Sequence, residues 1–225
     1  MANGGAFEHA VALAAQTPTL DIGCHIVLVQ GAGQPTTVSE LIRALLKRQI
    51  NPYNEARTQI AKILAAGIKL THLDTHKHTH LLPPVLEAVS RLAREFQIPW
   101  VRRPFDFGVG AGVKLQKKAV ALGMRLVRPS FAKKLEGLRT TDHFTGFQIT
   151  GALNTASLIH TLERLPAGLT ELMCHPGCLG PELVRAKTRL KQSRAVELAA
   201  LTSPEARAAI ARRGIRLVNY SSTSL

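Results

Sequence analysis

The chain has 225 residues, of which 45% are apolar, and this length and composition predict one α/β domain over residues 1–225. No apolar run approaches the roughly 20 residues that cross a bilayer, and the start of the chain resembles no signal peptide, so we expect a cytoplasmic protein. The three cysteines make a disulfide framework unlikely in this chain, and the net charge of +14 favours anionic partners.

Helical and strand patterns alternate along the chain. Asn51 followed by Pro52 is the N-cap and first-turn signal of a helix that Gly67 ends. Alternation of this kind predicts a parallel sheet or barrel. The patterns predict helices over 7–15, 51–66, 83–92, 155–164 and 203–214, and strands over 20–29, 68–74, 99–104, 169–175 and 215–220.

Much of the positive charge lies in clusters. Solvated helix faces are one interpretation, and contact with an anionic membrane surface is another. Nucleic-acid binding is disfavoured, because aromatic residues are only 4% of the chain and no known binding motif accompanies the basic residues. The clusters are Lys114, Lys117, Lys118, Arg125 and Arg128; Lys133 and Lys134; and Arg185, Lys187, Arg189, Lys191 and Arg194.

The stretch HLDTHKHTH, residues 72–80, holds four of the nine histidines of the chain and one aspartate. It begins at the carboxyl end of the predicted strand 68–74, where α/β folds assemble their active sites. Neutral imidazoles with a carboxylate are ligands for a divalent metal, and two or three of these side chains could reach one ion. The alternative is a surface loop of hydrogen-bonded polar residues. Further histidines, His25 in GCHIVLV and His175 in MCHPG, stand at other predicted strands.

Four separated motifs carry a resemblance to a known family: DIGCHIVLV, HLDTHKHTH, MCHPG and SRAVELAALTSPEARAAIARRGIRLVNY. In this order they resemble the YdjC-like carbohydrate deacetylases, over nearly the whole chain. The stretches LRTTDHFTGF and GGAFEHAVALA look most like the hopanoid-biosynthesis-associated members, whose substrate is an N-acetylglucosaminyl hopanoid glycolipid. The resemblance implies an irregular (β/α) barrel of the polysaccharide deacetylase or glycoside hydrolase type.

The resemblance also implies roles for individual residues. His25 and His76 match the two histidines that bind a divalent ion, Mg or Zn. The neighbouring polar residues would hold the ligating imidazoles or order the loop. These are His72, Asp74, His78 and His80.

On the substrate side, His175 matches a His-Pro motif whose histidine is the candidate general acid for the leaving amine. Arg102 and Arg103, at the end of the predicted strand 99–104, would meet substrate oxygens. The implied reaction is metal-assisted hydrolysis of an acetamide.

The sequence departs from the family in one respect. Family members begin with a strand and an Asp-Asp-Phe-Gly motif that supplies the metal carboxylate and the catalytic base. We expect that the first strand is missing here and that the domain is truncated at its amino terminus. The stretch Asp106-Phe107-Gly108 echoes the motif but follows a different predicted strand.

Three interpretations therefore compete. The first is a metal-dependent deacetylase acting on an N-acetylated sugar or glycolipid, weakened by the missing aspartates. The second is a catalytically impaired remnant that still binds metal or sugar. The third is a basic protein associated with a membrane or a nucleic acid, in which histidines bind metal structurally. Partners expected under the first are the substrate and an anionic inner membrane face, and a homodimer is left open.

Overall fold

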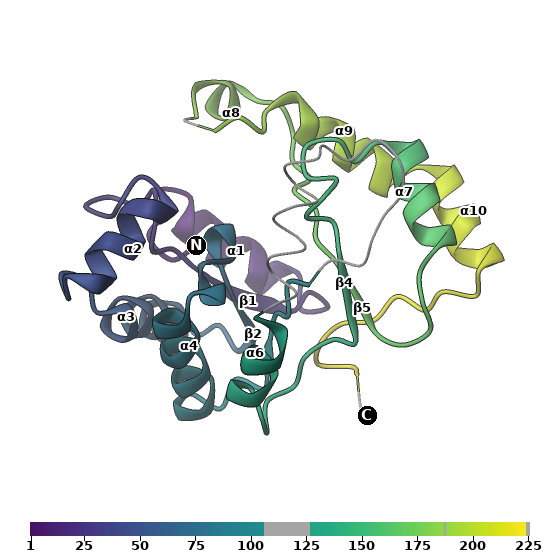
Figure 1. The fold of residues 1–225 in the computed structure, drawn as a ribbon. Helices are drawn as coiled ribbons and strands as arrows, with labels where there is room; N and C mark the ends of the chain where they lie inside the picture. The colour runs from purple at the N-terminus through teal and green to yellow at the C-terminus, as the bar shows by residue number, and fades with distance from the viewer. Residues whose placement is uncertain (106–126, 187, 224–225) are drawn as a thin grey trace. The chain divides into compact units, whose positions relative to one another are not determined.

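The computed structural model describes residues 1–105, 127–186 and 188–223, and the chain divides into two compact units. The first unit comprises Met1–Arg102, Val127–Thr140 and Val218–Leu225, and the second comprises Arg103–Leu126 and Thr141–Leu217. Figure 1 labels most of their helices and strands and colours the chain from its amino to its carboxyl terminus. The single domain predicted from the sequence stays a prediction.

The first unit is built on a three-stranded parallel sheet in the order β1-β2-β3. Its strands are β1 (Ile22–Ile26), β2 (Leu70–Thr75) and β3 (Trp100–Val101). The 3-10 helix η1 (His76–Leu81) follows β2 directly. The α-helices of this unit are α1 (Phe7–Gln16), α2 (Val38–Leu46), α3 (Pro52–Ala65), α4 (Pro83–Glu95) and α6 (Arg128–Lys134).

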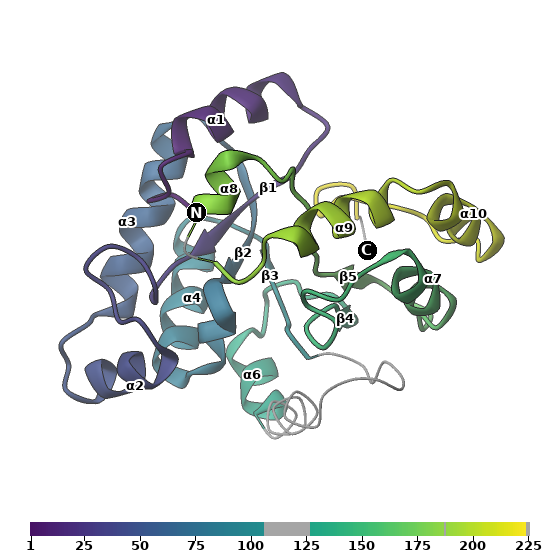
Figure 2. The ribbon, with the colours of Figure 1, turned by 90° about the horizontal axis from the view of Figure 1, so that it is seen from above.

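Helices α3 and α4 pack against each other and against the sheet, α3 on β1 and α4 on β3; both run beside the strands in Figure 2. Helix α3 begins where the sequence predicts, because the Asn51 side chain accepts hydrogen bonds from the backbone N–H groups of Tyr53 and Asn54. Helix α4 buries apolar residues at helical spacing, with Val89 and Leu92 fully buried. These helices supply much of the core of the first unit.

The register of β1 and β2 decides which side chains share a face. Gly23 pairs with His72 and His25 with Asp74, so the side chains of His25, His72 and Asp74 lie on one face of the sheet. Cys24, on the other face, is fully buried. A Cβ atom on Gly23 would lie 2.2 Å from Nε2 of His72, so only glycine lets the His72 ring lie over β1 at this point.

The second unit contains a two-stranded parallel sheet, β4 (His143–Thr145) and β5 (Thr170–Leu172). Helix α7 packs against α9 and α10. The helices of this unit are α7 (Thr155–Glu163), α8 (Pro181–Arg185), α9 (Gln192–Leu201) and α10 (Pro204–Arg212). Its core includes a cluster of buried residues formed by Leu153, Leu158, Leu162, Ala200, Ala206 and Ala209.

The predicted α/β class with parallel strands is confirmed, as are the helices that became α1, α3, α4, α7 and α10. The predicted strand over 215–220 is wrong: these residues form no strand, and the side chain of Leu217 is 75% exposed. An apolar run forms a strand only where a neighbour covers and pairs with it. Helices α2, α6, α8 and α9 and strand β4 were not predicted, and Asp106-Phe107-Gly108 lies outside the described residues.

Among the residues that the structure describes, no helix combines the length and the apolar character needed to cross a membrane.

Candidate active site

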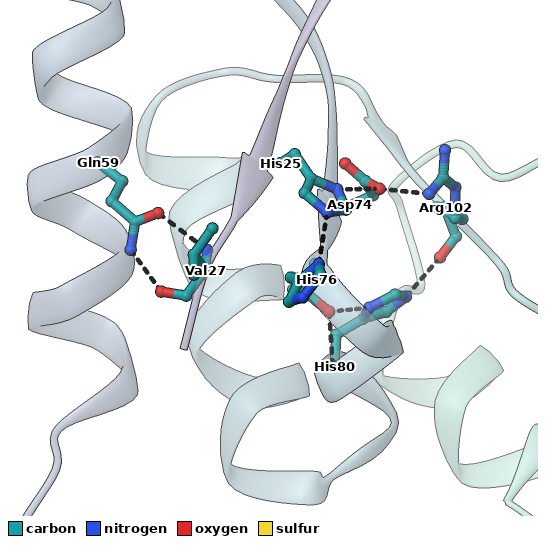
Figure 3. A network of polar contacts seen from close by, with 8 residues as sticks. His25, Val27, Gln59, Asp74, His76, His80 and Arg102 are labelled. Carbon is teal, nitrogen blue, oxygen red and sulfur yellow. Dashed lines mark hydrogen bonds and ion pairs between the residues drawn. The ribbon is translucent and has the colours of Figure 1, made fainter. Parts of the chain in front are cut away.

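Polar side chains on one face of the three-stranded sheet form a cluster at the carboxyl ends of β1 and β2. His25 and Asp74 are paired across the two strands, and His76 is the first residue of η1. Carboxyl ends of parallel strands are where α/β folds place their functional groups. Figure 3 shows these side chains, together with Arg102, which follows β3.

Asp74 is the centre of this cluster. Its Oδ2 accepts a hydrogen bond from Nδ1 of His25 at 2.7 Å and also binds Nη1 of Arg102 in an ion pair. The Asp74 side chain is only 6% exposed and that of Arg102 14%. Burial alone would raise the pKa of Asp74. The charge of Arg102 and the hydrogen bond from His25 together lower this pKa by more than burial raises it, so it lies well below its usual range. Asp74 is therefore an anion that holds His25 by its Nδ1.

The imidazoles of His25 and His76 face each other. Nε2 of His25 lies 3.4 Å from Nδ1 of His76, and Nε2 of His76 lies 3.2 Å from Oε1 of Gln30. The contact between the two rings is a hydrogen bond when one of the facing nitrogens is protonated. In the tautomers in which the outer nitrogens donate to Asp74 and Gln30, both facing nitrogens carry lone pairs, as metal ligands do.

The geometry and the donor types fit two ligands of one metal ion. Two imidazole nitrogens on a tetrahedral zinc ion, each about 2.0–2.1 Å from it, are about 3.3 Å apart. In metal sites the outer nitrogen of a ligating histidine is commonly held by a carboxylate or a carbonyl oxygen, as Asp74 and Gln30 do here. Across residues 1–105, 127–186 and 188–223, however, no three His, Cys, Asp or Glu side chains form a complete metal-binding group.

The turn that presents His76 is strained and well anchored. Lys77 and His78 have φ angles of 54° and 52°, in the left-handed region that non-glycine residues seldom adopt. The buried His80 holds this turn, and its Nδ1 lies 2.7 Å from the Thr75 hydroxyl. Its Nε2 lies 3.0 Å from the carbonyl oxygen of Arg102 (Figure 3). The hydroxyl of Thr75 also accepts the backbone N–H of His80 at 3.0 Å.

A second anchor lies beyond the end of β1. The buried side-chain amide of Gln59, on α3, accepts from the N–H of Val27 at 2.9 Å and donates to its carbonyl at 2.8 Å (Figure 3). This pair of bonds replaces the neighbour that a strand would otherwise need at this position. It fixes the segment that leads from His25 to Gln30.

The remaining histidines of the 72–80 stretch lie apart from this pair. His72 stacks on the ring of Tyr220 with centroids 4.3 Å apart, and burial lowers its pKa. Burial also lowers the pKa of His78 to about 3 and that of His80 to about 4. All three are therefore neutral near pH 7, and the contacts of His72 and His80 are those of structural residues.

Arg103 and His175 belong to the second unit. His175 follows β5 and is partly buried. Its backbone N–H donates to Oε2 of Glu197 at 2.5 Å, and its carbonyl accepts from Nη1 of Arg194 at 3.5 Å. Glu197, on α9, is only 1% exposed.

Two residues that the sequence did not single out take part in these contacts. Gln30 holds the outer nitrogen of His76, and Glu197 holds the backbone at His175. Neither has a sequence signal of its own: Gln30 stands in a loop, and a glutamate in an amphipathic helix ordinarily indicates a solvated face. Arg102, expected at substrate oxygens, has its guanidinium against Asp74.

Comparisons with known proteins identify the family of this chain. The profile of the YdjC-like protein family matches residues 1–212. A carbohydrate deacetylase from Brevibacillus brevis is 32% identical over 234 residues, covering 98% of this chain and 85% of the relative. A chitooligosaccharide deacetylase from Serratia marcescens is 31% identical over 241 residues, with the same two coverages, 98% and 85%.

A solved structure shows the same fold. It is a protein from Enterococcus faecalis V583 whose name refers to cellobiose-phosphate cleavage; it aligns with a TM-score of 0.73 at 24% identity, over 99% of this chain and 85% of that one. At this identity the likeness concerns the fold alone. The family match and the relatives together show that the chain belongs to the YdjC-like protein family.

Proposed function

We propose that this protein is a metal-dependent hydrolase that removes the acetyl group from an N-acetylated sugar. The observation that carries the proposal is the His25–His76 pair, whose facing nitrogens are 3.4 Å apart while their outer nitrogens bind Asp74 and Gln30. Family membership and the names of the relatives, which are carbohydrate and chitooligosaccharide deacetylases, support the same reaction.

In this proposal His25 and His76 hold the ion. Imidazole nitrogens favour zinc over magnesium, the other ion that the resemblance implies. The chemistry that a divalent ion supplies is Lewis acidity toward the acetyl carbonyl and the attacking water. Asp74 keeps His25 in one tautomer and strengthens it as a donor, while Arg102 keeps Asp74 ionised.

We assign His175 as the general acid: it donates a proton to the sugar nitrogen as the bond from that nitrogen to the acetyl carbon breaks, and the water that is consumed supplies the proton that restores His175. An amine leaves poorly as an anion, so a proton donor at that nitrogen lowers the barrier. Arg102 and Arg103 are the proposed contacts for substrate oxygens, and for Arg102 this contact competes with its ion pair to Asp74.

The finer proposal is that the sugar is carried by a lipid, an N-acetylglucosaminyl hopanoid, at an anionic membrane surface. The segment around α8 supports contact with such a surface. Leu179 is 43% and Val184 54% exposed, and Arg185 and Arg189, which follow within ten residues of Leu179 in the sequence, are exposed as well. Apolar side chains among basic ones are the composition that binds anionic bilayers peripherally. We also propose that the parallel strands belong to an irregular (β/α) barrel.

Acetate release tests the reaction. The parent, His76→Ala and His9→Ala would be assayed with zinc on chitooligosaccharides and on an N-acetylglucosaminyl glycolipid. His9 is an exposed histidine of α1 and serves as the matched control. We expect the parent and His9→Ala to release acetate and His76→Ala to release little. Sugar or zinc binding without acetate from any substrate would instead identify a binding protein.

A further inference from the structure

Helix α9 holds the chain that follows β5 at three points. Oε2 of Glu197 accepts from the N–H of His175 at 2.5 Å. Nη1 of Arg194 donates to the carbonyl of His175 at 3.5 Å, and the carbonyl of Arg194 accepts from the N–H of Gly177 at 3.1 Å. Residues 175–177 are thus fixed by one helix of the same unit.

The hydrogen bond from His175 to Glu197 lies just beyond the last backbone hydrogen bond between β5 and its neighbour. Strand β5 ends at Leu172, and the N–H of Met173 still donates to the carbonyl of Thr145 at 2.8 Å. Two residues later the N–H of His175 donates to a side-chain carboxylate of α9. The Glu197 carboxylate therefore takes over the positioning of the backbone at the residue that we assign as the general acid.

Packing does not explain a glutamate at this position. Glu197 is 1% exposed, and burying a carboxylate is costly unless hydrogen bonds compensate it. Its Oε2 has the charge-assisted bond to His175, but its Oε1 has no hydrogen-bond partner among the described residues. An apolar residue of similar size would stabilise the interior of the unit more than a glutamate does. The role of Glu197 is therefore its hydrogen bond to the backbone of His175.

We propose that Glu197 is a positioning residue for His175: its buried carboxylate fixes the backbone N–H of His175 and thereby directs the imidazole for proton transfer. The catalytic part of this inference rests on the proposed function, whereas the positioning part does not. Misplacement of a reacting group by about 1 Å can lower a rate by about 10²-fold.

Three variants separate positioning from packing and from charge. Glu197→Leu removes the acceptor and keeps the volume, and Glu197→Gln keeps an acceptor oxygen and removes the charge. Glu163→Gln removes a carboxylate from an exposed ion pair with Arg212 in the same unit and is the control. We expect Glu197→Leu to lower kcat by about 10²-fold with KM nearly unchanged, Glu197→Gln to retain most of kcat, and Glu163→Gln to match the parent.

The amide proton resonance of His175 in a ¹H–¹⁵N spectrum is the readout that does not depend on turnover. A hydrogen bond to a carboxylate shifts this proton downfield, so we expect an upfield move that is largest in Glu197→Leu, smaller in Glu197→Gln and absent in Glu163→Gln. An unchanged His175 resonance in both Glu197 variants would overturn the positioning. If Glu197→Leu does not fold, the His175 amide resonance of Glu197→Gln alone tests the positioning.

The two proposals fail in different ways. A parent that releases no acetate contradicts the proposed function, and the amide resonance then still tests whether Glu197 positions His175. An active parent whose Glu197→Leu variant shows a moved resonance and full kcat contradicts the catalytic part of the inference alone.

Discussion

The imidazole of His25 donates its Nδ1 proton to the buried carboxylate of Asp74 across two parallel strands, at 2.7 Å. The same carboxylate oxygen binds the guanidinium of Arg102. One anion thus connects the ends of β1, β2 and β3, and its removal should affect both the stability of the first unit and the histidine that we assign to the metal.

The first prediction concerns Asp74→Asn. This change keeps the shape but leaves the mostly buried charge of Arg102 without its anion, and breaking such a pair from one side costs about 3 kcal/mol. We expect the free energy of unfolding to fall by about that amount. Urea unfolding followed by fluorescence measures it, because Trp100 is the single tryptophan and lies in the first unit.

The control for this experiment is Glu163→Gln, which breaks an exposed ion pair with Arg212 in the second unit. Exposed pairs contribute about 0–1 kcal/mol, so the transition seen by Trp100 should hardly move. Equal unfolding curves for Asp74→Asn and the parent would show that the Asp74–Arg102 pair does not stabilise the first unit.

A second prediction concerns pH. The pKa values of His78 and His80 are lowered to about 3 and about 4, below the unfolded value near 6.5. Between these values the unfolded chain binds more protons than the folded chain, so stability rises with pH and falls as the pH drops from about 6.5 to about 4. Each histidine contributes a slope of about 1.4 kcal/mol per pH unit. Urea midpoints that stay constant from pH 6.5 to pH 4 would contradict the buried, neutral state of both rings.

The sequence predicted the elements that have strong local signals. Asn51 and Pro52 begin a helix and Gly67 follows its end, because capping and backbone conformation are decided within a few residues. The position of the histidine stretch at the end of β2 was likewise predictable, since it depends only on where one strand ends.

The arrangement of the site was harder to predict from the sequence. That Asp74 holds His25 depends on the register of two strands whose residues are 49 positions apart, and a slip of one residue would turn Asp74 to the other face. The burial of Glu197 and the exposure of Leu217 are decided by tertiary packing. The local pattern predicted a strand at Leu217, and no helix was predicted around Glu197.

A third prediction concerns His175. If it donates the proton to the leaving amine, His175→Ala should lower kcat by about 10²–10⁴-fold, the usual contribution of a general acid or base, and leave KM nearly unchanged. His160→Ala is the matched control, because His160 is an exposed histidine of α7 in the same unit. Acetate release at saturating substrate measures both variants, and full activity of His175→Ala would remove this residue from the mechanism.

A fourth prediction concerns the segment around α8. We expect the protein to sediment with anionic vesicles at low salt and less at high salt, since each basic residue at the surface contributes about 1 kcal/mol. Replacing the exposed Leu179 and Val184 together by serine should weaken this binding. Leu46→Ser, at a 79% exposed leucine of the first unit, should not. Equal sedimentation with neutral and anionic vesicles would dispose of the membrane proposal.

The His25–His76 pair is tested most directly by calorimetric titration with zinc of the parent, His25→Ala, His76→Ala and His9→Ala. If the two facing nitrogens, 3.4 Å apart, are ligands of one ion, the parent binds one zinc ion per chain. His25→Ala and His76→Ala then each bind it at least about 10-fold more weakly, and His9→Ala binds as the parent does. Zinc binding by His76→Ala that is as tight as that of the parent would contradict the assignment of this pair.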